Sequence, residues 1–198
     1  MDAVRHSSHS PGRYAPNVIT RHERARRTRE ALIEAGLELA ETTPLAGMSV
    51  NRVVEQAHVA KGSFFYHFGD RAGYLLALHR GFHDGVLADV RVATGGQPPG
   101  ADRLATVAAG YLDACLRRRG VRALLLEARA QPAVAGEIRV RSDQIARLCE
   151  PDFRAMGRAH PLESARLWVG LVAEAALIEH DAGARLPDLR AALREYLR

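Results

Sequence analysis

Apolar residues recur along most of this chain with the spacing of an α-helix. In one early segment Leu32, Ala35 and Leu39 fall on one side of a helix, and polar residues separate them. No useful length of the chain shows the two-residue alternation that is typical of a half-buried strand. The pattern predicts an all-α fold of about nine helices. Their expected ranges are 20–41, 49–56, 60–67, 70–92, 102–119, 121–130, 132–157, 162–181 and 187–197.

Capping residues and prolines mark where these helices begin. Thr20 and Glu23 have the spacing of a capping box, in which each side chain binds the backbone N–H of the other residue. Ser49 and Asp70 are expected N-caps, because a short side-chain oxygen can accept from the first free N–H groups. Three prolines also stand where a helix can start, since a proline at the first position loses no hydrogen bond: Pro132, Pro161 and Pro187.

The chain is expected to have three parts. Residues 1–19 contain prolines and glycine without periodicity, which predicts a flexible basic arm. Residues 20–69 form the first folded part, with two short helices after one longer helix. Residues 70–198 form a larger helical part that begins with a long helix.

Composition narrows the classes of partner. The 198 residues carry a formal net charge of +5, and such an excess favours a polyanion such as nucleic acid. The two cysteines are too few for a disulfide framework or a zinc cluster. No cofactor or metal is expected. The first residues have no apolar run typical of a secretion signal, and no segment has a membrane helix's apolar length, so a cytoplasmic protein is expected.

The segment from Ser49 to Phe68 has the layout of a helix-turn-helix. Two short helices with small apolar residues are joined by a tight turn, which lets them cross closely. The second helix is expected to expose a dense group of hydrogen-bond donors, together with one glycine that leaves a gap. Such a group could contact a DNA groove and its phosphates. Its members are Lys61, which is the only lysine of the chain, Gly62, Ser63, Tyr66 and His67.

From Arg29 to Leu76 the chain resembles, without a gap, the N-terminal domain of TetR-type transcriptional regulators. The stretch Ala57-His-Val-Ala-Lys-Gly-Ser-Phe-Phe-Tyr-His-Phe68 resembles that family's turn and recognition helix, and Asp70-Arg-Ala-Gly-Tyr-Leu75 resembles the start of its fourth helix. The sequence departs from the family pattern at several positions: Ala40 in place of an aromatic residue, His58 in place of a glycine, Ala60 in place of a serine and Phe65 in place of a phosphate-binding tyrosine.

The resemblance implies roles for individual residues. Lys61 and Gly62 would meet base edges, since a lysine can donate to guanine and a glycine allows close approach. Arg71 would contact DNA from the start of the fourth helix, where the helix dipole also favours an anion. Ser63, Tyr66 and His67 would hold phosphates. Ser49 and Phe65 complete the candidate DNA-binding set.

The resemblance also implies that residues 70–198 bind a small effector and form a homodimer. The segment 162–181 is apolar almost all round, which predicts burial on nearly every side. Together with 187–197 it would form a four-helix interface between two copies. A pocket is expected among the central helices. Its candidate residues are polar or aromatic groups in apolar surroundings: Tyr111, Cys115, Glu127, Trp168 and Glu174.

The expected function is a DNA-binding transcriptional repressor that an apolar or amphipathic effector releases from a palindromic operator. An activator of the same family is the alternative within this class. An all-α enzyme and an architectural protein that binds DNA without sequence preference are the alternatives outside it. No carboxylate pair stands in a recognisable catalytic context, and the basic residues favour one compact reader over dispersed patches. The sequence does not name the effector, the operator or the regulated genes.

Overall fold

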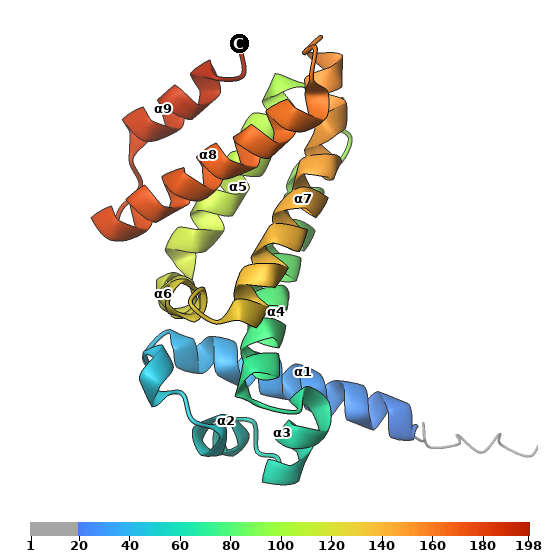
Figure 1. Ribbon diagram of the computed structural model, residues 1–198, viewed down its shortest axis with the longest axis vertical. Helices are drawn as coiled ribbons and strands as arrows, with labels where there is room; N and C mark the ends of the chain where they lie inside the picture. Colours follow the sequence, from blue (N-terminus) through green and yellow to red (C-terminus); the bar gives the residue numbers. More distant parts are fainter. Residues whose placement is uncertain (1–19) are drawn as a thin grey trace, which may run out of the picture.

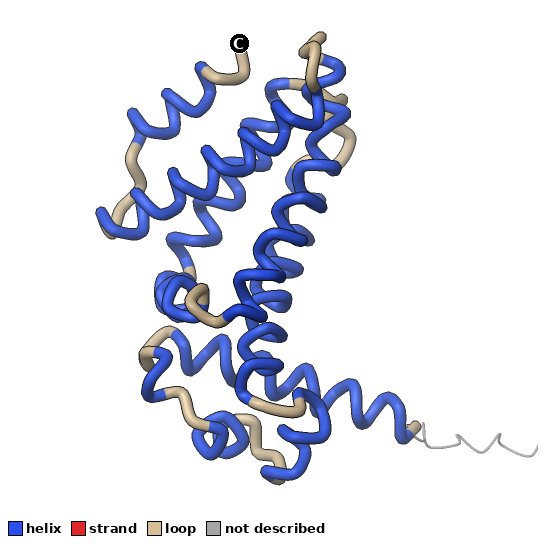
Figure 2. The backbone as a smooth tube through the Cα atoms, viewed as in Figure 1, coloured by secondary structure: helices blue, strands red, loops and turns tan. Residues whose placement is uncertain are grey.

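The computed structural model describes residues 20–198, and this part of the chain is all-α, as the sequence predicts (Figure 1). Nine α-helices and one short 3-10 helix are joined by loops, and no strand occurs among the described residues (Figure 2). The predicted arm at 1–19 lies outside them. The elements are α1 (Arg21–Ala40), η1 (Leu45–Gly47), α2 (Val50–Gln56), α3 (Lys61–Phe68), α4 (Arg71–Ala93), α5 (Ala101–Arg117), α6 (Arg119–Ala128), α7 (Pro132–Ala155), α8 (Pro161–Ala182) and α9 (Pro187–Glu195).

The helices begin where the capping signals predict. The Thr20 hydroxyl accepts from the Glu23 N–H at 3.2 Å, and the Glu23 carboxylate accepts from the Thr20 N–H at 2.9 Å. Ser49 and Asp70 cap α2 and α4 in the same way, each through the N–H three residues further on. The helices α7, α8 and α9 all start with a proline. Local chemistry therefore marks the start of six of the nine described helices.

The helices α1, α2 and α3 pack with the start of α4 into one small core. Leu32, Val53 and Phe64 are fully buried there. The Tyr74 hydroxyl donates to the Leu32 carbonyl at 2.7 Å, which places a side chain of α4 against the backbone of α1. A Cβ atom on Gly36 would lie 2.0 Å from that hydroxyl, so only glycine leaves room for it. This contact fixes α4 against the three-helix unit.

The remaining helices form a larger bundle. Helix α4 runs from the three-helix unit into the bundle, where α5 and α7 pack against it and α8 packs in turn on α5 and α7 (Figure 1). Helix α6 crosses between the two parts, and α9 lies against α5 and α8. An ion pair is buried under α9: the Arg190 guanidinium donates two hydrogen bonds to the Glu179 carboxylate, each 2.7 Å long. A third, of 2.6 Å, goes to Asp113 on α5.

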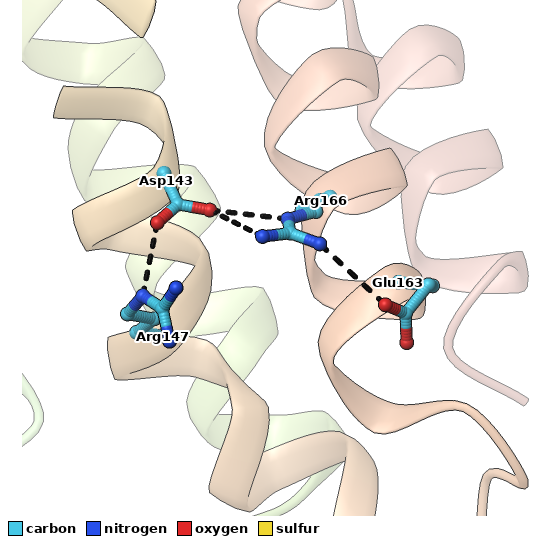
Figure 3. A network of polar contacts seen from close by, with 4 residues as sticks. All are labelled: Asp143, Arg147, Glu163 and Arg166. Atoms are coloured by element: carbon cyan, nitrogen blue, oxygen red, sulfur yellow. Dashed lines mark hydrogen bonds and ion pairs between the residues drawn. The ribbon is translucent and has the colours of Figure 1, made fainter. Parts of the chain in front are cut away.

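An exposed polar network joins α7 to α8 (Figure 3). Asp143 lies between Arg147 of its own helix and Arg166 of α8, and it accepts hydrogen bonds of 2.9 Å and 2.7 Å from them. Arg166 also contacts Glu163 at 3.5 Å. The bonds from Arg166 and Arg147 lower the pKa of the Asp143 carboxyl. Exposed pairs of this kind contribute little stability, so the buried apolar contacts between α7 and α8 hold the two helices together more than this network does.

A single chain covers only one side of α8, whereas the predicted burial on nearly every side includes an interface between two copies. One side packs on α5 and α7, but an apolar row on the other side faces outward, and Leu167 on it is 72% exposed. Gly170 and Ile178 continue this row at helical spacing, and the charged Glu174 lies between them. The uniform apolar pattern does not show which side of a helix its own bundle covers. Among residues 20–198, no helix combines the length and the apolar character that crossing a membrane requires.

One local feature was not predicted. The 3-10 helix η1 occupies the link that was expected to be a plain break between the first two helices. Helix α7 continues through Pro151, as the predicted range 132–157 requires, although a proline inside a helix removes one backbone hydrogen bond.

Candidate DNA interface and ligand cavity

A tight turn joins α2 to α3. Val53 on α2 and Phe64 on α3 face the core and hold the two helices together. His58 has a φ of 54°, the only positive φ outside glycine in the described residues. The sequence predicts this conformation, because His58 stands where a glycine is common. The turn fixes how α3 projects from the unit.

The outer face of α3 carries most of the predicted DNA-binding residues. Tyr66 is 76% exposed, Phe65 is 47% exposed, and Lys61 and Gly62 are also exposed. A Cβ on Gly62 would meet nothing within 4 Å, so the glycine leaves an open gap. Ser63 and His67 are half-buried at the edges of this face. Burial, together with the charge of Arg29, lowers the pKa of His67. His67 is therefore uncharged at neutral pH in the free protein.

The other two predicted DNA-binding residues are engaged inside the protein. The Ser49 hydroxyl accepts from the Arg52 N–H at 3.3 Å as the cap of α2. The Arg71 guanidinium donates to the Leu45 carbonyl of η1. Arg71 remains exposed, so its other donors still face solvent. It joins α4 to η1 in addition to any contact with a phosphate.

A cluster of arginines on α1 lies next to this face. The first two turns and a half of the helix expose Arg21, Arg24, Arg26, Arg27 and Arg29. Arg26 pairs with Glu30 at 2.7 Å, and the Arg29 guanidinium lies 5.5 Å from the centre of the Phe68 ring at the end of α3. The second contact places positive charge beside the recognition face, as a phosphate-binding surface requires.

A cavity of about 310 Å³ lies inside the larger bundle. Its walls come from α4, α5, α6, α7 and α8. Tyr111 and Trp168, two of the predicted pocket residues, line it. Much of the wall is aliphatic: Val86, Val90, Val107, Leu125, Ile138, Ile145 and Val172. This size and apolar lining fit a small organic ligand.

The other three predicted pocket residues do not line the cavity. Cys115 is buried in the bundle outside the cavity lining, and burial raises its pKa and that of Tyr111. Glu127 points to the three-helix unit, where its carboxylate accepts from the Leu45 N–H at 3.2 Å. Glu174 belongs to a shallow hollow on the outward side of α8. The presence of a polar residue in an apolar stretch was therefore not enough to predict which residues line the cavity.

The sequence analysis missed the polar groups that do line the cavity. His79 and His83 project from successive turns of α4, with ring centres 4.4 Å apart. Burial lowers the pKa of His79 to about 4, and burial together with His79 lowers that of His83 to about 3. Their four-residue spacing was visible in the sequence and also suits a metal site, but no cluster of three metal-ligating side chains occurs in residues 20–198.

Charged groups in the wall come mainly from arginine. Arg103 binds Asp152 through two hydrogen bonds of 2.6 Å, and the same carboxylate accepts from the Gly100 N–H at 2.9 Å. Arg141 pairs with Asp84 at the rim. Arg122 of α6 is buried, and within the described chain no ion pair or hydrogen bond engages its side chain.

Comparison with known proteins agrees with this geometry. Residues 32–78 match the family model for bacterial regulatory proteins of the tetR family. The helix-turn-helix of this chain is therefore of the TetR type. The proteins of this family are transcriptional regulators and not enzymes. None of the curated proteins that were compared matches the chain.

Solved structures of TetR-type regulators share the fold over most of the chain. A transcriptional regulator from Rhodococcus sp. Rha1 is 25% identical, with 85% of this chain and 93% of that chain covered and a TM-score of 0.71. A TetR transcriptional regulator from Rhodococcus sp. RHA1 is 19% identical, with 88% and 96% covered and a TM-score of 0.64. The multidrug binding protein EbrR, in complex with imidazole, is 22% identical, with 86% and 94% covered and a TM-score of 0.68.

Proposed function

We propose that this regulator is a homodimeric repressor that leaves a palindromic operator when a small apolar or amphipathic effector enters the cavity. The observation that carries the DNA-binding part is the outer face of α3. Lys61, Gly62 and Tyr66 are exposed together on a helix that a tight turn and a buried Phe64 hold in place. A lysine beside a gap can reach the edge of a guanine, and the neighbouring arginines of α1 supply charge for phosphates.

The outward row of α8 supports the homodimer. Leu167 and Ile178 are large apolar side chains exposed on it, and Gly170 between them allows another helix to approach closely. Tyr196, at the end of α9, is also exposed and lies by the same shallow hollow. An apolar face of this kind is common at an interface between copies. A two-fold dimer would place two copies of α3 one DNA turn apart, which is about 34 Å.

The position of α4 supports release by an effector. Its first turn packs on α3 through Tyr74, and its middle carries His79 and His83 into the cavity. A ligand that favours one position of α4 would therefore change the direction in which α3 projects. Coupling of this kind typically amounts to about 1–3 kcal/mol, and DNA must weaken effector binding by the same factor.

Selection from random DNA tests this function. Full-length protein is used to enrich sequences from a random-sequence pool, and the enriched DNA is footprinted. A discrete protected site with two-fold symmetry is the expected result. Continuous coverage without sequence preference would point to an architectural protein, and the absence of protection would contradict DNA binding. Placing the selected site in front of a reporter gene separates a repressor, which lowers expression, from an activator, which raises it.

A further inference from the structure

Arg122 is a buried charge without a partner in the described part of the molecule. Only 6% of the residue is exposed, and its Nε–H is fully buried without an acceptor. A guanidinium keeps its charge in proteins, and burying an unpaired charge is costly. Proteins normally place a carboxylate beside such a group, as this chain does for Arg190 with Glu179. The exception at Arg122 therefore calls for an anion from outside.

The acidic groups near the cavity are already engaged. Asp152, the acidic residue in the wall, accepts three hydrogen bonds from Arg103 and Gly100. Glu179 is bound by Arg190 and by the Leu186 N–H. Neither carboxylate forms a hydrogen bond or an ion pair with Arg122 in the described structure.

The histidines in the wall do not compete for an anion as cations. His79 and His83 stay neutral at physiological pH, since burial and the charges of Arg122, Arg129 and Arg141 all disfavour their protonation. Neutral imidazoles can still exchange hydrogen bonds with a ligand, and Nδ1 of His79 is buried without a partner in residues 20–198. The cavity wall thus combines one buried positive charge that has no partner in the described structure, on Arg122, with neutral imidazoles, while Arg129 is exposed to solvent. This arrangement fits a single negative charge.

We propose that the effector is an amphipathic organic monoanion, whose carboxylate pairs with Arg122 and whose apolar part lies along the aliphatic wall. A guanidinium can bind a carboxylate through two parallel hydrogen bonds, which gives both affinity and orientation. The wall of Val86, Val90, Leu125 and Ile145 suits a hydrocarbon chain or ring. Only the regulatory role of this anion rests on the proposed function, because the anion site itself follows from the cavity and from Arg122.

Three probes of equal length and different charge test the inference in calorimetric titrations at neutral pH. Octanoate is negative, octanamide is neutral and octylammonium is positive. Octanoate is expected to bind at least about tenfold more tightly than octanamide, which corresponds to ~1.4 kcal/mol, and octylammonium more weakly than either. Failure of all three to bind, or equal binding of octanamide or octylammonium, would overturn the inference without any variant.

Two variants test whether Arg122 is the arginine that binds the carboxylate. Arg122→Met keeps the length and apolar stem of the side chain, and it is expected to bring octanoate and octanamide within about twofold of each other. Arg129→Gln removes the same charge from an exposed position in the cavity wall and is expected to preserve the preference. A preference that survives in Arg122→Met, or that disappears equally in both variants, would contradict a site on Arg122. If Arg122→Met does not fold, Arg122→Lys should keep the order of the three probes.

A DNA measurement separates this inference from the proposed function. Octanoate is titrated into the complex with the DNA site selected by the protein. Tight octanoate binding without DNA release would support the anion site and contradict the inducer role. DNA binding that depends on Lys61, combined with no preference for octanoate, would support the regulator and overturn the anion site.

Discussion

The Glu127 carboxylate of α6 accepts a hydrogen bond from the Leu45 N–H of η1, so that a cavity-forming helix rests directly on the three-helix unit. The same helix makes a second contact through the Gly120 N–H, which donates to Glu41 at 3.0 Å. Its opposite side carries Arg122 and Leu125 into the cavity wall. Helix α6 is thus a second connection between the cavity and the three-helix unit, beside the long α4.

The contact at Gly120 leaves no room for a side chain. A Cβ there would lie 2.3 Å from the Glu41 Cα and 2.4 Å from the Ala40 carbonyl oxygen, and both are backbone atoms that cannot rotate away. We expect Gly120→Ala to destabilise the protein by ~1–3 kcal/mol, the usual cost of overpacking, as measured by denaturant unfolding. Gly85→Ala in α4 is the control, because a Cβ there meets nothing within 4 Å. Equal effects of the two substitutions would contradict the steric argument.

Lys61 is expected to carry sequence preference. Lys61→Ala should weaken binding to the selected DNA site by ~1–3 kcal/mol and relax its selectivity, while binding to unrelated DNA changes much less. Arg71→Ala should weaken all sequences about equally and reduce the salt slope by ~1, as the loss of one phosphate contact does. Fluorescence anisotropy at several salt concentrations measures both. Unchanged selectivity in Lys61→Ala would show that α3 does not read the bases through this side chain.

Acid should destabilise the fold through His79. Its folded pKa of about 4 lies below the ordinary histidine value, so the unfolded chain takes up a proton first as the pH falls. Above pH ~6.5 His79 is neutral in both states and costs no stability. As the pH falls from ~6.5 to ~4, the free energy of unfolding decreases by at most about 3 kcal/mol. We expect His79→Leu to flatten this part of a melting-temperature profile. His22→Gln, at an exposed position on α1, should leave the profile unchanged, and a profile unaffected by His79→Leu would exclude this origin.

The Arg190–Glu179 pair should be sensitive to the loss of one partner. Burial opposes the ionisation of Glu179, but hydrogen bonds from Arg190 and from the Leu186 N–H outweigh it and lower its pKa. Arg190→Leu would leave a buried carboxylate without a cation, at a cost of ~3–5 kcal/mol in unfolding free energy. Replacing both residues with leucine should recover much of that loss. If the double variant were as unstable as the single one, lost packing and not the unpaired charge would be responsible.

The sequence predicted the features that depend on local chemistry. The capping box at Thr20, the cap at Ser49 and the initial prolines each act within a few residues, so they mark helix ends without knowledge of the fold. The helix-turn-helix is also local, and even the unusual φ of His58 could be anticipated from its place in the turn. The exposed face of α3 followed from the same short-range pattern.

The cavity depended on contacts that the sequence does not display. Glu127 and Arg122 are five residues apart on one short helix, yet one turns to η1 and the other to the cavity. Their direction depends on how α6 crosses between two packed parts. The His79–His83 spacing was a usable signal, but it gains meaning only when α5, α6 and α7 close around α4. Tertiary packing therefore decides which polar residues form the site.

The outward row of α8 links the proposed dimer to the abundance of the protein. While copies remain separate, Leu167 and Ile178 stay in water and each chain offers a single reading helix. If two copies must meet before both half-sites are filled, operator occupancy at low concentration rises with the square of the number of chains. The operator would then change from free to fully occupied over a narrower range of protein concentration than it would with a monomeric binder.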